Sequence, residues 1–62
     1  MAKLLVLNGK YVVKGLNITF KLHKDKVLMV RNFIGGTKIL LNDGSFIAFS
    51  ETSEPVYFAP RR

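Results

Sequence analysis

The chain has 62 residues, with ten Lys and Arg against four Asp and Glu, a formal charge of +6, and neither Cys nor Trp. A chain this short forms one domain, residues 1–62, that buries only about 60% of the surface exposed by its unfolded form. The absence of Cys excludes disulfides and thiolate zinc sites, and the 48% share of hydrophobic residues excludes disorder of the polar, charge-rich kind.

The apolar segments are too short to cross a membrane as helices. Runs such as Leu4 to Leu7 and Val27 to Val30 have four residues, against the roughly 20 that a spanning helix needs. The first residues lead directly into a strand-like segment, without the apolar stretch and cleavage site of a signal peptide. We therefore expect an intact cytoplasmic protein with no membrane partner.

Turn signals divide the chain at intervals of seven to eleven residues, at Asn8-Gly9, Gly15, Lys24-Asp25, Gly35-Gly36 and Asp43-Gly44. Asn-Gly, Gly-Gly and Asp-Gly supply the positive φ of two-residue type I′ turns, which match the twist of antiparallel strands. The intervening segments are rich in Val, Ile, Leu, Phe and Tyr. They predict six strands, at Lys3 to Leu7, Tyr11 to Lys14, Asn17 to Leu22, Val27 to Ile34, Thr37 to Leu41 and Ser45 to Phe49.

The end of the chain predicts one more short strand. Ser50 to Pro55 has room for one irregular or 3₁₀ turn, and Val56 to Phe58 then form a seventh strand. Pro55 and Pro60 bracket this strand, and proline is confined to the edges of sheets, so we expect an edge or closing strand. No helical period competes with this all-β pattern.

Two predicted hairpins are apolar on both faces. With two-residue loops, the first hairpin pairs Leu5 with Val12, and the Asp43-Gly44 hairpin pairs Leu40 with Ile47. A single small barrel has one wet face, so these side chains need cover. The cover would come from the tail, from a second sheet, or from another chain, either as a homo-oligomer or as a protein partner.

The predicted fold is an all-β, highly twisted antiparallel meander of six to seven strands. It would close into a small SH3-like or OB-like barrel, which we prefer, or form a compact two-sheet roll. The register of the Lys24-Asp25 hairpin is open, because an even loop pairs Leu22 with Val27 and an odd loop pairs Leu22 with Leu28. The face that Arg31 occupies is therefore open as well.

Candidate catalytic groups are scarce, and ordinary structural roles explain each of them. His23 and Asp25 resemble a base with its acid, but a tight exposed turn accounts for both. Glu51 and Glu54 lie in a segment with the composition of an exposed connection. Gly35-Gly36 precedes a predicted strand instead of the helix that a phosphate-binding loop needs. We expect no enzyme, no metal or other cofactor, and no small-molecule substrate.

The charge points to a polyanion. Residues 1 to 38 carry eight Lys and Arg against Asp25 alone, whereas residues 39 to 62 carry Arg61 and Arg62 against three acids. Small β-domains bind single strands with basic side chains on phosphates and aromatic rings on bases. Lys outnumbers Arg, which favours phosphate contact over base readout. We predict a small basic protein that binds DNA or RNA with little sequence specificity, through Lys10, Tyr11, Lys14, Lys21, Lys24, Lys26, Arg31 and Lys38, with Tyr11 as the stacking residue.

The alternative function is a small protein-binding or inhibitory module, of the kind that viruses encode. It would act through exposed apolar sheet faces and would form a homo-oligomer or dock on a larger protein. In that case the lysines keep the protein soluble and protect its strand edges from aggregation.

Overall fold

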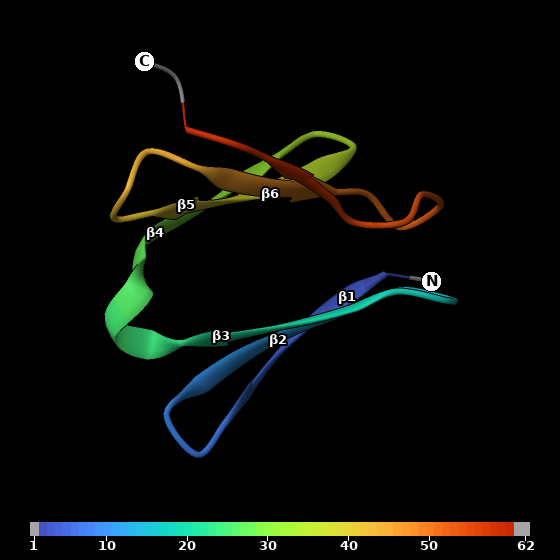
Figure 1. Ribbon diagram of the computed structural model, residues 1–62. Helices are drawn as coiled ribbons and strands as arrows, with labels where there is room; N and C mark the ends of the chain where they lie inside the picture. The colour runs from blue at the N-terminus through green and yellow to red at the C-terminus, as the bar shows by residue number, and fades with distance from the viewer. Residues whose placement is uncertain (1, 61–62) are drawn as a thin grey trace.

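The computed structural model describes residues 2–60 and is all-β (Figure 1). All seven predicted strands form, with ends that differ by at most two residues from the expected ones, and one 3₁₀ turn separates the third from the fourth. The elements are β1 (Lys3–Leu7), β2 (Lys10–Lys14), β3 (Thr19–His23), η1 (Lys24–Lys26), β4 (Val27–Phe33), β5 (Gly36–Leu41), β6 (Phe46–Phe49) and β7 (Val56–Phe58).

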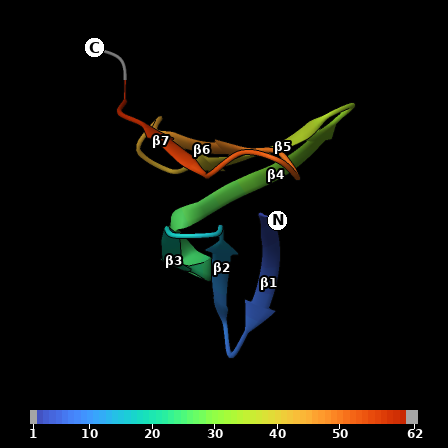
Figure 2. The same cartoon turned by 90° about the vertical axis from the view of Figure 1, so that its right-hand side faces the viewer.

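The strands form two antiparallel sheets that lie one above the other. Figure 1 and Figure 2 show the three-stranded sheet β1-β2-β3 below the four-stranded sheet β4-β5-β6-β7, with η1 linking the two at one end. The closed barrel that we preferred from the sequence is wrong, since within residues 2–60 no strand of one sheet pairs with a strand of the other. The two-sheet alternative is the architecture that forms.

The Lys24-Asp25 segment explains why the barrel stays open. It folds into the 3₁₀ turn η1 and is not a hairpin, so the chain leaves the three-stranded sheet after His23 and starts a new sheet at Val27. Both registers considered for this segment are therefore wrong. Asn42 holds the turn with two hydrogen bonds. Its Nδ2 donates to the Asp25 carbonyl oxygen, and its backbone N–H donates to the Lys26 carbonyl oxygen at 2.9 Å.

The core lies between the facing sides of the two sheets. Val13, Ile39 and Ile47 are completely buried, and Phe49 and Ala2 are nearly so. Alternate residues of each strand supply this inner face, as the period of two requires. Half-buried side chains pack around this core and come from β1, β3, β4 and β5: Leu4, Phe20, Leu22, Val27, Val30 and Leu41.

The first hairpin has the predicted turn and the predicted register. Asn8 and Gly9 both have positive φ, 47° and 75°, as a type I′ turn requires. Leu5 pairs with Val12 across β1 and β2. This register places alternate residues of both strands on the core and the others on the outer face.

The hairpin between β5 and β6 differs from the prediction by one residue. Its loop has three residues, Asn42 to Gly44, in which the Gly44 N–H donates to the Leu41 carbonyl at 3.1 Å and Gly44 takes a φ of 91°. A type I turn followed by a left-handed glycine is the usual three-residue loop. Leu40 consequently pairs with Phe46, and the predicted pairing of Leu40 with Ile47 is wrong.

One carboxylate ties the two sheets together. The backbone N–H groups of Leu16 and Asn17, in the loop after β2, donate to the two carboxylate oxygens of Glu54 at 2.8 Å each. Glu54 is half-buried in the connection between β6 and β7, so the expectation of a solvated loop is wrong for it. A Cβ at Gly15 would lie 2.0 Å from Glu54 Oε1 and 2.6 Å from Pro55 Cδ, so only glycine fits where the loop after β2 passes the connection between β6 and β7.

Candidate nucleic-acid interface

The two signs of charge occupy different parts of the fold. Within residues 2–60, every charged residue on a strand is a Lys or Arg: Lys3, Lys10, Lys14, Lys21, Arg31 and Lys38. The acids all lie in turns and connections, with Asp25 in η1, Asp43 in the loop after β5, and Glu51 and Glu54 between β6 and β7. Both outer sheet faces are therefore cationic, because strand alternation points these side chains away from the core.

The outer face of the four-stranded sheet combines cations with aromatic rings. Arg31 and Lys38 are direct partners across β4 and β5. Phe33 lies two residues beyond Arg31 on the same face of β4, and Phe46 and Phe58 are direct partners across β6 and β7. We call these five residues the aromatic platform.

The side chains of the aromatic platform contact one another. Lys38 Nζ lies 4.5 Å from the ring centroid of Phe46 and 6.0 Å from that of Phe33, and Arg31 Cζ lies 5.7 Å from the Phe33 centroid. These are cation–π distances. The rings of Phe46 and Phe58 stack with centroids 4.6 Å apart and an interplanar angle of 14°. The cations are thus held over a layer of rings.

Two of the rings remain open to a ligand. Phe33 is 52% exposed and Phe58 is 43% exposed, whereas Phe46 is covered by Phe58 and Lys38. A recess of about 400 Å³ adjoins them, lined in part by Phe33, Gly36, Lys38 and Phe58. Gly36, the partner of Phe33 across β4 and β5, places no side chain beside the ring. A Cβ at Gly36 would lie 2.9 Å from the Phe49 carbonyl oxygen.

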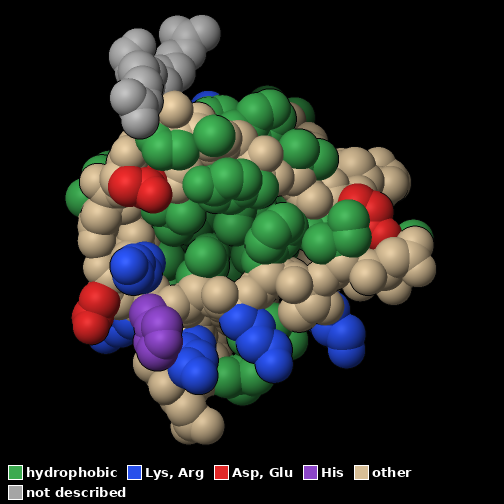
Figure 3. All heavy atoms as spheres, viewed as in Figure 1, with side chains coloured by type: hydrophobic (Ala, Val, Ile, Leu, Met, Phe, Trp, Pro, Cys, Tyr) green, Lys and Arg blue, Asp and Glu red, His purple; other side chains and the backbone are tan. Residues whose placement is uncertain are grey.

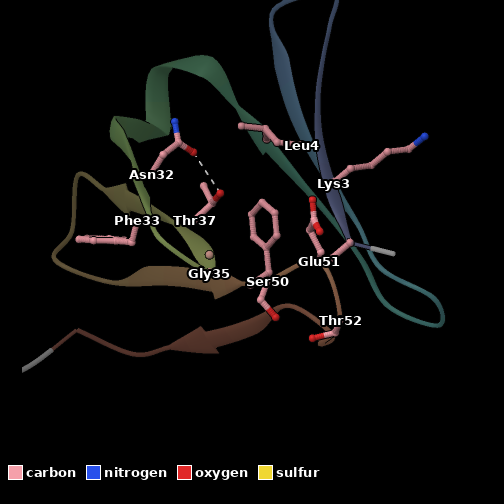
Figure 4. A pocket seen from close by; sticks show the side chains of 12 residues that line it. Lys3, Leu4, Asn32, Phe33, Gly35, Thr37, Ser50, Glu51 and Thr52 are labelled. Atoms are coloured by element: carbon pink, nitrogen blue, oxygen red, sulfur yellow. Dashed lines mark hydrogen bonds between the residues drawn. The ribbon is translucent and has the colours of Figure 1, made fainter.

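A larger pocket of about 620 Å³ opens between the sheets, near the start of β1 (Figure 4). Asn32 and Thr37 on its wall are hydrogen-bonded to each other at 3.1 Å. Lys3 and Phe33 extend away from each other at its two sides, so they do not converge on a common point in the pocket (Figure 4). Glu51 is the one carboxylate among the lining residues.

The predicted contact residues of the first three strands are divided between two faces. Lys10, Lys14 and Lys21 lie on the outer face of the three-stranded sheet, together with Lys3, which the prediction omitted. Tyr11 lies on the inner face, where it pairs with Leu22 and is half-buried. The structure therefore separates Tyr11 from the lysines beside which we expected it to stack.

The remaining predicted residues lie at the corner and on the platform. Lys24 and Lys26 are exposed in η1, between the two sheets, and Arg31 and Lys38 are brought together across β4 and β5. Figure 3 shows Lys and His side chains along the lower sheet, with hydrophobic side chains gathered above them. Arg61 and Arg62, the two cations at the end of the sequence, lie outside the described residues.

The prediction missed Phe46 and Phe58 because their face depends on the register of one hairpin. With the expected two-residue loop, Phe46 would pair with Leu41 and point to the core side. The signal that identifies the longer loop is Asn42-Asp43-Gly44 followed by Ser45, because Asp two residues before Ser favours an Asx turn. No signal in the sequence identifies the contact of Glu54 with the loop after β2.

Asp43 fixes that loop through its carboxylate. The side-chain hydroxyl and the backbone N–H of Ser45 both donate to Asp43 Oδ1, the second at 2.9 Å. These hydrogen bonds stabilise the ionised carboxylate and lower the pKa of Asp43 below its ordinary value of 3.8. The turn that places Phe46 on the platform is therefore held by a charged group.

Comparisons with protein-family models, with curated protein sequences and with solved structures found no match. Among residues 2–60, no three His, Asp or Glu side chains gather closely enough to hold a metal ion. No helix in the described part of the chain is long and apolar enough to cross a membrane.

Proposed function

We propose that this protein binds single-stranded nucleic acid on the aromatic platform, with little sequence specificity. One observation carries the proposal: two directly paired cations lie among three phenylalanine rings on an outer sheet face. In this function Arg31 and Lys38 bind phosphates, and bases stack on Phe33 and Phe58. Stacking on aromatic rings tolerates every base, which accounts for the low specificity.

Unpaired bases are the expected ligand because two of the rings, Phe33 and Phe58, are exposed on an outer sheet face. A base within a duplex is already stacked on both sides and cannot reach Phe33 or Phe58. The charge agrees with this ligand. Arg31 and Lys38 are like charges directly opposite each other, an arrangement that destabilises a sheet unless an anion lies between them. Phosphate supplies that anion.

The test is fluorescence anisotropy of labelled single-stranded DNA, RNA and duplex DNA between about 50 and 200 mM salt. We expect the logarithm of the affinity for single strands to fall linearly with the logarithm of the salt concentration. The double variant Arg31→Gln, Lys38→Gln loses two phosphate contacts and should reduce the slope for single strands by about 1.4. No binding at the lowest salt concentration would overturn the proposal.

Stacking has its own matched pair of variants. Phe58 and Tyr57 are neighbours on β7 with similar exposure, 43% and 47%, but their side chains lie on opposite faces of the sheet. Phe58→Leu should weaken single-strand binding by about 1–3 kcal/mol, and Tyr57→Leu should leave it unchanged. Equal effects of the two variants would mean that the platform does not stack bases.

The alternative function, a viral-type protein-binding or inhibitory module, rests on the apolar side chains of the same face. Met29 and Val56 are about half exposed beside the rings. Self-association through this face would bring Arg31 and Lys38 of two copies together, which their like charges oppose. Sedimentation equilibrium separates the functions, because a salt-resistant dimer that binds no oligonucleotide would favour the alternative.

A further inference from the structure

We infer that the outer face of the three-stranded sheet is a second nucleic-acid contact, so that one molecule bridges two nucleic-acid segments. The inference rests on the proposed function for one of the two contacts, the aromatic platform. The second contact consists of Lys3, Lys10, Lys14 and Lys21, which we call the lysine face.

The lysines of this face are spread over all three strands. Lys3 and Lys14 are direct partners across β1 and β2, Lys10 lies at the other end of β2, and Lys21 pairs with Val12 from β3. All four side chains are exposed. Lys10 and Lys14 are four residues apart on one strand and hence about 13 Å apart, which is the axial span of about four phosphates.

The lysine face differs from the aromatic platform in the chemistry that it offers. Between its lysines lie Leu5 and Val12, and among the described residues no Phe or Tyr shares the face. An ammonium group binds phosphate as a point charge, and without a ring there is nothing on which a base can stack. The lysine face therefore accepts the backbone of a duplex, whose bases are not available for stacking.

The two contacts point in opposite directions. Each sheet turns its inner side to the core, so the lysine face and the aromatic platform lie on opposite sides of the two-sheet stack, as the arrangement in Figure 2 shows. The molecule measures 29 × 28 × 21 Å, so two segments held in this way are separated by the whole thickness of the protein.

The experiment measures energy transfer between two labelled nucleic acids of unrelated sequence. A donor-labelled single strand of about 10 nucleotides, within the site size of single-strand binding domains, is mixed with an acceptor-labelled short duplex at about 50 mM salt. We expect energy transfer to rise as protein is added and to fall again when protein is in excess, because the two segments then occupy separate molecules.

Two double variants remove the same number of charges from opposite faces. Lys3→Gln, Lys14→Gln should reduce the salt slope for duplex binding by about 1.8 and weaken energy transfer, while single-strand anisotropy stays within about twofold of the parent protein. Arg31→Gln, Lys38→Gln should weaken single-strand binding and leave duplex binding unchanged. Circular dichroism spectra and melting curves of both variants test whether they fold.

The outcomes separate failure of this inference from failure of the proposed function. Normal single-strand binding without energy transfer would overturn bridging and leave the platform intact, whereas no single-strand binding would overturn the proposed function itself. Energy transfer that persists undiminished in Lys3→Gln, Lys14→Gln would mean that the lysine face does not hold the duplex and would overturn the inference. Binding of vesicles containing phosphatidylserine in place of the duplex would assign the lysine face to a lipid surface and overturn the inference.

Discussion

Glu54 is a single residue on which the joining of the two sheets depends. Its carboxylate accepts hydrogen bonds from the backbone N–H groups of Leu16 and Asn17 at 2.8 Å each. Gly15, in the same loop, lies too close to Glu54 and Pro55 to carry a side chain. Hydrogen bonds to an ionised group are stronger than those between neutral groups. The contact joins residues 37 and 38 positions apart in the chain, so local sequence patterns do not contain it.

Glu54→Ala should lower the free energy of unfolding by about 1–3 kcal/mol, since both N–H donors lose their partner. Urea denaturation measures this change. Glu51→Ala is the matched control, because Glu51 is an exposed carboxylate in the same connection. It should change stability by less than about 0.5 kcal/mol. Equal losses in the two variants would show that the Glu54 contact does not stabilise the fold.

Asp43 makes the stability of the β5–β6 loop depend on pH. Its pKa in the folded protein lies below 3.8 because Ser45 donates to its carboxylate. On acidification the carboxylate of Asp43 is therefore protonated in the unfolded chain at a higher pH than in the folded protein. The stabilisation that Asp43 gives the fold is complete above pH 3.8 and is lost as the pH falls through the lowered pKa of the folded protein. Urea midpoints of the parent protein and Asp43→Asn should converge on acidification below pH 3.8. A constant difference would contradict the prediction.

At the scale of the elements, strand positions follow from sequence but strand partners follow only in part. Alternation and turn residues locate all seven strands, and the Asn8-Gly9 turn fixes its own register because both residues adopt positive φ. A glycine after Asp43 is compatible with loops of two or three residues, and a change of one residue exchanges the faces of a strand. The prediction missed Phe46 and Phe58 for this reason, although it included Arg31 and Lys38.

The 3₁₀ turn η1 carries two of the predicted nucleic-acid contacts, at the corner between the two sheets. Lys24 and Lys26 are exposed at this corner, and they remain predicted phosphate contacts. The double reversal Lys24→Glu, Lys26→Glu should reduce single-strand affinity and lower the salt slope, because contacts are lost and repulsion is added. Anisotropy at several salt concentrations measures both. Unchanged affinity would remove the corner from the interface.

At the scale of the whole molecule, the excess positive charge opposes folding. All charged side chains on the described strands have the same sign, and the formal charge of the chain is +6. Salt screens this repulsion and a bound polyanion neutralises it. The melting temperature should rise between about 20 and 200 mM NaCl, and saturating oligonucleotide should raise it further at low salt. A melting temperature that does not respond to salt would show that the charges are too far apart to interact.

The separation of the strands into two sheets also determines how the chain folds. Every paired strand has its partner next to it in sequence, with β1 to β3 on one side of η1 and β4 to β7 on the other. Such short-range pairing closes only small loops, so each sheet can form by successive hairpins without waiting for distant segments to meet. Burial of Val13 against Ile39 needs both sheets, so docking of the two preformed halves is the step expected to set the folding rate.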